Sequence, residues 1–458
     1  MRISTFFRKK IVVSACVRAG MLALPVAACW PLPSLAQQTG QMNDDGDRFS
    51  IHGQTTYVWQ QKSGFDAAYS GDHSLRAARE YAYTFSGTLF LGARLWRGAE
   101  VYFDPEVVQG RPMSGVQGLG GPTNGEMQKV SGPSLKLYAA RGFVRQRFDL
   151  GGDDQQVASS ANQVVGTVKS RRVVVTVGNL AANDIFDRND YAGDPRGQFL
   201  NWSLLTYGAW DFPADGRGYT WGGAVEWYHD AWAVRAGRFE QPKWPNQMPL
   251  DSRLSRHYGD QIEVERDYQI AGKPGKVLLL GFRDRAVMAR YSDAMRLANA
   301  TGDVPSLDAV RAREHNKTGV GIDAQQAIGH DGGIFVRAMH ADGKTEVYAF
   351  SEVDRSLSAG LSLKGARWGR PDDTFGAALA INALSPLHRE YLACGGLGFF
   401  IGDGALDYRS ERILETYYSF RVAKAMHVSM DWQHIDNPGY NHARGPVHVV
   451  SARVHAEF

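Results

Sequence analysis

The sequence predicts an all-β protein: a transmembrane antiparallel β-barrel of about 16 strands, with long extracellular loops folded partly into the lumen. Three observations predict this fold. The chain begins with the pattern of an export signal, and it then alternates apolar and polar residues in runs of up to 9–11 positions. After residue 36 it contains no apolar run of the roughly 18 residues that a membrane-spanning helix needs.

The first 36 residues have the layout of a secretory signal peptide. Four basic residues lie within the first ten, an apolar run extends from Ile11 to about Trp30, and Ser34-Leu35-Ala36 places small residues before a cleavage site. A membrane anchor fits less well, because Arg18 interrupts the apolar run. Residues Val26–Cys29 loosely resemble a lipoprotein box, the motif in which the cysteine becomes the lipidated first residue of the exported chain. Lipidation at Cys29 is therefore an alternative. We expect a cleaved signal peptide over 1–36, a short N-terminal segment over 37–48 and the barrel domain over 49–458.

Removal of the signal changes the charge of the chain. The full sequence has 51 basic and 48 acidic residues, and residues 1–36 hold five basic and no acidic residues, which leaves 46 against 48 and a net charge of −2. Nucleic-acid binding needs a basic footprint, so no nucleic-acid partner is expected. Cys394 is the one cysteine after residue 36, so an internal disulfide in the exported chain is excluded.

The predicted strands are runs in which every second residue is apolar. In the clearest run, Tyr81–Leu91, aromatic and aliphatic residues alternate with Thr and Ser, as in a strand with one apolar and one polar face. Similar runs cover residues 51–59, 101–106, 173–177, 225–227, 357–364, 375–381, 414–422 and 426–432. The 422 residues after the signal give 16 strands of about 26 residues each with their connectors, a size that leaves an aqueous channel.

Two patterns favour a membrane barrel over a soluble β-sandwich. Short connectors, Trp96–Ala99 and Arg367–Asp373, alternate with long ones, Glu106–Ser134 and Arg290–Thr318, as in barrels with short periplasmic turns and long outer loops. Aromatic residues recur near strand ends, where interfacial girdles place them. These aromatic residues are Tyr57, Trp59, Tyr81, Trp96, Trp227 and Trp432.

The end of the sequence has the pattern of a last barrel strand. Apolar residues fall on one face of residues 447–458, and the last of them is aromatic. We expect this strand to be the signal by which the barrel-assembly machinery recognises the chain. The residues of this insertion signal are Val450, Ala452, Val454, Ala456 and Phe458.

Several strings of the chain resemble one family. Residues 178–222 read GNLAANDIFDRNDYAGDPRGQFLNWSLLTYGAWDFPADGRGYTWG, residues 354–376 read DRSLSAGLSLKGARWGRPDDTFG, and residues 395–415 read GGLGFFIGDGALDYRSERILE. With the last 22 residues, they resemble the carbohydrate-selective porin family of Gram-negative outer membranes from about residue 50 onward. The resemblance implies a 16-stranded barrel that passes sugars through a lumen narrowed by loops and polar side chains. Cys394 is a local departure from the expected small or apolar residue.

Residues for the constriction follow from strand parity and from irregular segments. Successive side chains of a strand alternate between its two faces, and this parity points Arg94, Asp104 and Glu106 into the lumen. Arg141, Arg145 and Arg147 share one face of the next predicted strand, and that face also carries Leu137 and Phe143. The irregular segment 184–210 combines acidic, basic, amide and indole groups, which suit sugar hydroxyls and ring faces. The constriction candidates are Arg94, Asp104, Glu106, Asn124, Glu126, Arg141, Arg145, Asp184, Asp187, Arg196, Asn201 and Trp202.

The expected function is passive diffusion of monosaccharides and small oligosaccharides through a water-filled pore in the outer membrane. No HExxH or GxSxG motif is present, and we expect no enzyme activity, cofactor or metal. The alternatives are a general or anion-preferring porin and a soluble exported carbohydrate-binding β protein. Outer-membrane lipid and the assembly machinery are the other expected partners, and the sequence leaves both a monomer and a homotrimer open.

Overall fold

A computed structural model describes residues 48–458 of the protein. The signal peptide expected over residues 1–36, with the alternative lipidation at Cys29, lies outside the described residues. The short N-terminal segment expected over residues 37–48 also lies outside the described residues, apart from Arg48. The division of the chain into signal peptide, N-terminal segment and barrel domain therefore stays a prediction. No helix within residues 48–458 is long and apolar enough to cross a membrane.

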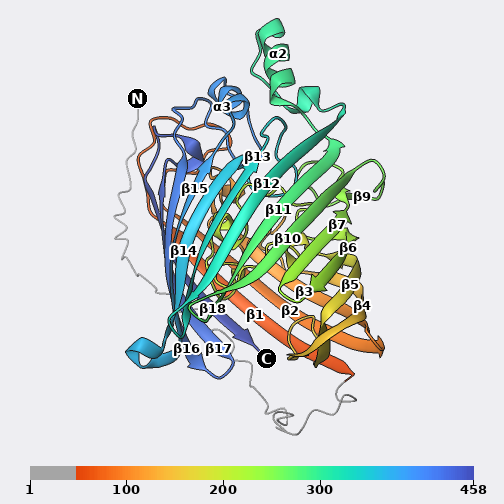
Figure 1. Ribbon diagram of the computed structural model, residues 1–458. Helices are drawn as coiled ribbons and strands as arrows, with labels where there is room; N and C mark the ends of the chain where they lie inside the picture. The colour runs from red at the N-terminus through yellow and green to blue at the C-terminus, as the bar shows by residue number, and fades with distance from the viewer. Residues whose placement is uncertain (1–47) are drawn as a thin grey trace, which may run out of the picture. The chain divides into compact units, whose positions relative to one another are not determined.

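Sixteen antiparallel strands of the described chain close into one barrel, which confirms the predicted fold class (Figure 1). The barrel closes where β1 pairs with both β2 and β18. The barrel strands are β1 (Phe49–Lys62), β2 (Glu80–Trp96), β3 (Ala99–Arg111), β4 (Lys136–Val157), β5 (Gly166–Leu180), β6 (Thr220–His229), β7 (Trp232–Phe239), β10 (Tyr258–Ile270), β11 (Lys273–Val287), β12 (Glu314–Ile328), β13 (Gly332–Ala341), β14 (Arg355–Gly365), β15 (Arg370–Ala383), β16 (Glu411–Ala423), β17 (Met426–Asp436) and β18 (Val447–Glu457). The short strands β8 (Gln241–Pro242) and β9 (Leu250–Asp251) form a separate ribbon.

The alternation along each strand separates a polar lumen from an apolar outer wall. In β1, the side chains of Gln54, Thr56 and Gln60 are buried inside the barrel, whereas Ile51 and Tyr57 are exposed outside. This arrangement is the reverse of a soluble barrel, because the outer wall faces lipid and the lumen holds the polar groups.

A β-bulge in β4 corrects the face assigned to one residue. Asp104 of β3 pairs with Arg141, and the register then shifts because Ala140 is an extra residue in β4. The bulge reverses the alternation, so Leu137 before it is exposed on the outer wall while Arg141 and Phe143 after it face the lumen. The sequence pattern placed Leu137 on the lumen face with the arginines, and that placement is wrong.

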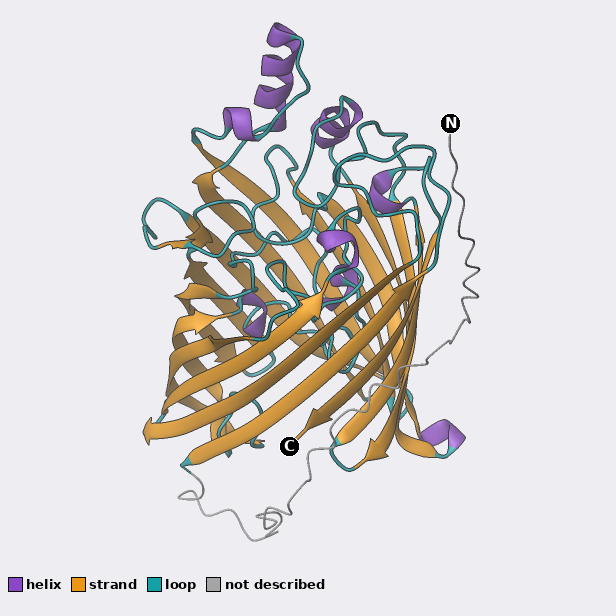
Figure 2. Ribbon diagram, turned by 180° about the vertical axis from the view of Figure 1, so that it is seen from behind, coloured by secondary structure: helices purple, strands orange, loops and turns teal. Residues whose placement is uncertain are grey.

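The connections are short at one end of the barrel and long at the other (Figure 1). The predicted short connector after Trp96 is a two-residue turn, in which Gly98 has a positive φ of 78° and approaches the backbone of Arg147 too closely for a side chain. The long-loop end and the lumen hold all helical elements except η4, which lies in a short turn (Figure 2). The helical elements are η1 (Met113–Val116), η2 (Ala182–Asp184), α1 (Trp202–Leu205), α2 (Tyr291–Thr301), η3 (Asp308–Val310), η4 (Ala366–Trp368), α3 (Pro386–Ala393) and η5 (Pro438–Tyr440).

Candidate functional site: the constricted lumen

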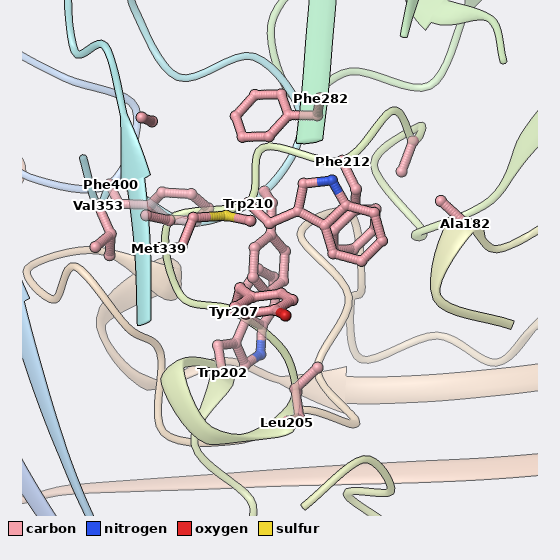
Figure 3. Close-up of a cluster of buried hydrophobic side chains, with 14 of the residues drawn as sticks. Ala182, Trp202, Leu205, Tyr207, Trp210, Phe212, Phe282, Met339, Val353 and Phe400 are labelled. Atoms are coloured by element: carbon pink, nitrogen blue, oxygen red, sulfur yellow. The ribbon is translucent and has the colours of Figure 1, made fainter. Parts of the chain in front are cut away.

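The connection between β5 and β6, residues 181–219, folds into the barrel and packs against its strands, and we call it the lumen segment. Its aromatic residues form the centre of a buried apolar cluster: Tyr207 and Trp210 are fully buried beside Phe212, next to Phe282 of β11 and Met339 of β13 (Figure 3). Burial of this much apolar area inside a polar barrel holds the lumen segment against the wall. The lumen is therefore narrowed by a packed element with its own core.

An ion-paired arginine of the wall anchors the lumen segment. Arg337 of β13 places its Nε 3.1 Å from Asp187 of the lumen segment and 3.2 Å from Asp323 of β12. Its Nη1 donates to the carbonyls of Ala192 and Leu204 at 2.6 and 2.9 Å. All three charged side chains are buried, with at most 1% exposed, so this contact is shielded from solvent.

A second set of anchors holds the start of helix α1. The carboxylate of Glu415 accepts hydrogen bonds from the backbone N–H groups of Leu200 and Asn201, and Asn201 Nδ2 donates to Gln433 at 3.1 Å. Trp202 Nε1 donates to the carbonyl of Asn124 at 2.8 Å. Four constriction candidates, Asp187, Asn201, Trp202 and Asn124, are thus buried against protein, where they position the inward loops and do not face water.

The polar edge of the lumen segment carries two arginine–carboxylate groups. Arg141 of β4 donates from Nε and Nη2 to both oxygens of Asp184 at 2.7 Å. Arg196 of the lumen segment lies 3.0 Å from Glu126 and 3.2 Å from Glu106. Burial alone lowers the pKa of Arg196, but the two carboxylates outweigh this and raise it, so the guanidinium stays charged.

Arg141, Asp184 and Arg196 border a cavity of about 600 Å³ that occupies the short-turn half of the lumen. The cavity is lined by side chains of both signs and by aromatic faces such as Phe143 and Tyr228. Six arginines and five carboxylates line it: Arg141, Arg145, Arg147, Arg172, Arg188, Arg196, Glu100, Asp184, Asp194, Glu226 and Glu457. A neutral, hydroxyl-rich solute would find both donors and acceptors along this wall.

Three further candidates lie on the barrel wall, and one of them, Asp104, reaches the polar edge, where its carboxylate is 3.6 Å from Arg141. Arg145 lines the cavity and donates to the carbonyl of Asn162 at 3.0 Å. Asp104 is fully buried and accepts a hydrogen bond from Asn162 at 2.8 Å. Arg94 points inward, as parity predicts, but donates to the carbonyl of Val165 in the short-turn connection between β4 and β5. Arg94 is therefore remote from the lumen segment's polar edge.

Sequence patterns missed the residues that the loops bring to this edge. Tyr138 and Tyr219 both donate to the Glu106 carboxylate, and the Tyr219 ring lies 5.2 Å from the guanidinium of Arg141. Arg188, by contrast, belongs to the irregular segment 184–210 that the sequence did single out, and it lines the cavity and is exposed. Tyr138 belongs to a face that only the bulge defines, and Tyr219 precedes β6 without a distinguishing neighbour. No signal in the sequence singles them out.

The last strand lies where its pattern places it. Val450 and Val454 are about 40% exposed on the outer wall, and Ala452 and Ala456 share that face. Phe458 is 74% exposed. The role of these residues as an insertion signal stays a prediction.

A closed antiparallel barrel with an apolar outer wall, a charged lumen and an inward-folded loop defines a porin-type channel. The model of the carbohydrate-selective porin, OprB family, matches residues 72–458, and the chain belongs to that family. The chain is similar to Pseudomonas putida OprB at 18% identity, over 89% of this chain and 94% of that one, with a TM-score of 0.68.

Other solved structures are less similar. The Pseudomonas aeruginosa proteins OccK2 (OpdF) and OccK5 (OpdH) are each 9% identical over 90% of this chain. The matches cover 97% and 98% of those two chains, with TM-scores of 0.45 and 0.44. No curated protein matches the chain. The family confirms the resemblance found in the sequence: the protein is a porin of the Gram-negative outer membrane through which sugars diffuse.

A buried histidine connects three loops at the long-loop end of the barrel through ion pairs and a ring contact. His388 of α3 is fully buried, with Nδ1 3.0 Å from Asp354 and Nε2 3.4 Å from Glu352. Its ring stacks on Tyr291 of α2 at 4.3 Å, and the tyrosine hydroxyl lies 3.1 Å from Nε2. Burial alone lowers the pKa of His388, but the two carboxylates overcome this and raise it from 6.5 to about 9.

We expect this contact to make the loop end sensitive to alkaline pH. Because the folded pKa lies above the unfolded one, the stabilisation, about 3 kcal/mol, is complete below pH 6.5 and is lost as the pH rises through about 9. Amide hydrogen exchange in residues 384–410, corrected for the intrinsic rate, should quicken between pH 7 and 10. In His388→Gln, which cannot titrate, this pH dependence should vanish. Equal corrected protection of the wild type at both pH values would contradict the prediction.

Proposed function

We propose that monosaccharides and short oligosaccharides are selected at the polar edge of the lumen segment, where Arg141, Asp184 and Arg196 face the cavity. The observation that carries the proposal is this juxtaposition of charge-fixed donors and acceptors with a cavity of about 600 Å³. Porin selectivity comes from the width of the path and the groups that line it.

The chemistry of the edge suits a sugar. A pyranose presents hydroxyls around its rim and C–H groups on its faces. Arg141 and Arg196 retain N–H groups beyond those that bind carboxylates, because a guanidinium has five donors, and Asp184 offers acceptor capacity at 30% exposure. Tyr228, which lines the cavity and is only partly buried, provides a face for the C–H groups. Since the ion pairs already satisfy much of the charge, each sugar contact stays weak and the solute can leave.

Export and assembly complete the proposal. Residues 1–36 would direct the chain across the inner membrane and be cleaved there, and the last strand would be recognised by the barrel-assembly machinery. The exposed apolar wall, with Ile262 and Val320 among its residues, supports a lipid environment. No cofactor and no catalytic step are part of the proposed function.

Liposome swelling with the purified, detergent-folded protein tests the proposal. Glucose, a disaccharide, a trisaccharide and an amino acid of glucose's size are compared at equal osmolarity. We expect sugars to enter faster than the size-matched amino acid, and the rate to fall with each added ring, because the path narrows at the lumen segment.

Two outcomes would overturn the proposed selection. Swelling governed by size alone would indicate a general porin. A preference for anions, seen as a reversal potential of the corresponding sign in a salt gradient, would mean that the cavity arginines act as an electrostatic filter. The six arginines and five carboxylates that line the cavity predict a weak ion preference.

A further inference from the structure

The outer wall of the barrel carries a cluster of arginines at its long-loop end. We call it the outer arginine patch: Arg238 of β7, Arg283 and Arg285 of β11 and Arg256 in the loop before β10, with the acidic residues Asp260 and Glu314. The arginine side chains remain between 41% and 62% exposed. Charged side chains are unusual on a lipid-facing wall, so this cluster indicates a binding partner of opposite charge.

Neighbouring residues establish that the patch faces outward. Gly259 precedes Asp260 in β10, and a Cβ on Gly259 would lie 2.7 Å from Pro213 of the lumen segment. Asp284 follows Arg283 in β11 and is fully buried. Because successive residues of a strand point to opposite faces, Asp260 and Arg283 lie on the outer wall.

The patch lies directly beyond the apolar band of the wall. Asp260 pairs across the sheet with Arg238 and Arg283. Two residues further toward the short-turn end, Ile262 pairs with Gly281 and is 55% exposed. Two residues of a strand span about 7 Å, so the arginines lie at the height of the lipid headgroups of the outer leaflet.

The first half of the patch has two cations and one anion. Arg238 donates to both oxygens of Asp260 at 2.7 and 2.9 Å, and Arg283 donates to the same carboxylate at 2.9 Å. The Tyr258 ring lies between them, 3.9 Å from the guanidinium carbon of Arg238 and 5.2 Å from that of Arg283. The shared carboxylate and ring hold two half-exposed guanidinium groups close together.

The second half repeats this charge ratio. Arg256 and Arg285 both donate to Glu314, at 2.6 and 2.7 Å for the shortest contacts, and His257 lies 3.3 Å from the same carboxylate. Across the patch, four guanidinium groups face two carboxylates, a net charge of +2 before any contribution from the histidine. The excess positive charge, on planar donors, matches phosphate oxygens.

We propose that the outer arginine patch binds the phosphate groups of a phosphorylated lipid in the outer leaflet. The acyl chains of that lipid would lie on the apolar band below, along Ile262 and Leu279, which is 51% exposed. The phosphates would then meet Arg238 and Arg283, with Arg285 and Arg256 beside them. The binding is independent of the sugar path, because it uses the opposite face of the wall.

Lipid binding by the full-length, detergent-folded protein tests the proposal. The probes are bisphosphorylated lipid A, its dephosphorylated form and inorganic phosphate, and the readout is the dissociation constant from native mass spectrometry. We expect the phosphorylated lipid to bind at least about tenfold more tightly than the dephosphorylated one, because guanidinium–phosphate hydrogen bonds are charge-assisted. The double variant Arg238→Gln/Arg283→Gln should lose most of that difference.

Two further variants keep the test decisive. Asp260→Asn removes the competing carboxylate while both arginines stay, so it should strengthen binding severalfold, a gain that misfolding cannot produce. Arg171→Gln is the matched control, because Arg171 is also an exposed arginine, 46% exposed and paired with Asp230, but lies on β5 near the short-turn end. It should leave binding unchanged.

Three results would overturn the proposal. Equal affinity for the phosphorylated and dephosphorylated lipids would exclude phosphate recognition. A loss in Arg171→Gln as large as that in the double variant would indicate non-specific attraction. Full displacement of the lipid by equimolar inorganic phosphate would mean that the patch binds free phosphate and has no lipid specificity.

Discussion

Arg337→Leu is expected to release the lumen segment from the wall and to open the pore. The substitution leaves Asp187 and Asp323 buried without their shared cation, and it removes donors to the carbonyls of Ala192 and Leu204. Loss of one partner of a buried charge pair costs about 3–5 kcal/mol. Because the barrel hydrogen bonds are unaffected, the cost falls on the docking of the lumen segment. Single-channel conductance should rise severalfold, and trypsin should cleave within residues 181–219.

Arg453→Leu is a matched control for this experiment. Arg453 of β18 is equally buried and also holds the lumen segment, through hydrogen bonds at 2.6 and 2.7 Å to the carbonyls of Pro195 and Gln198. Among the described residues it has no carboxylate within ion-pair distance, so its loss removes hydrogen bonds and a longer-range attraction to Asp431 but no direct ion pair, and should cost only about 1–3 kcal/mol. Adding Asp187→Asn to Arg337→Leu should restore part of the docking. Unchanged conductance in Arg337→Leu would show that the aromatic cluster alone holds the segment.

The barrel was predictable because strand pairing follows a local rule. Period-two alternation assigns residues to two faces wherever a strand is regular, and it correctly placed Tyr57 outside and Glu106 inside. It failed at Ala140, where one inserted residue shifts the register and reverses the faces of β4. A bulge depends on the partner strand as well as on the strand itself, so the pattern of β4 alone could not reveal it.

The lumen segment was predictable in composition and not in detail. Its mixture of acidic, basic and aromatic residues marked it as an inward loop, but the pattern did not separate anchors from pore-lining groups. Trp202 suits a sugar face in isolation, yet it stacks on Phe350 at 5.1 Å and is 5% exposed. Asp187 could accept a hydrogen bond from a sugar hydroxyl, yet its carboxylate already accepts one from Arg337, which lies 150 positions later in the sequence. Such assignments depend on long-range contacts that no local signal encodes.

Arg196→Gln is expected to weaken sugar selection and shift the pore toward cations. Arg196 bridges Glu126 and Glu106, and its side chain is 20% exposed to the cavity. Without it, two carboxylates remain together at the constriction, and their charge favours cations. A hydrogen bond from a charged donor contributes about 1.5–3 kcal/mol, so the dissociation constant for glucose should rise by about tenfold or more. Current block by glucose measures this affinity, and the reversal potential in a salt gradient measures the ion preference.

Arg147→Gln separates this role from the general charge of the cavity. Arg147 lines the same cavity, has the same 20% exposure and pairs with Asp149 at 3.4 Å, but it lies further along β4 toward the short-turn end. Both variants remove one positive charge from the cavity. If the edge of the lumen segment selects sugars, Arg196→Gln should lower glucose affinity while Arg147→Gln leaves it within about twofold, a difference below 0.5 kcal/mol. Equal losses in both variants would assign selection to the net charge of the cavity, because position along the lumen would then have no effect.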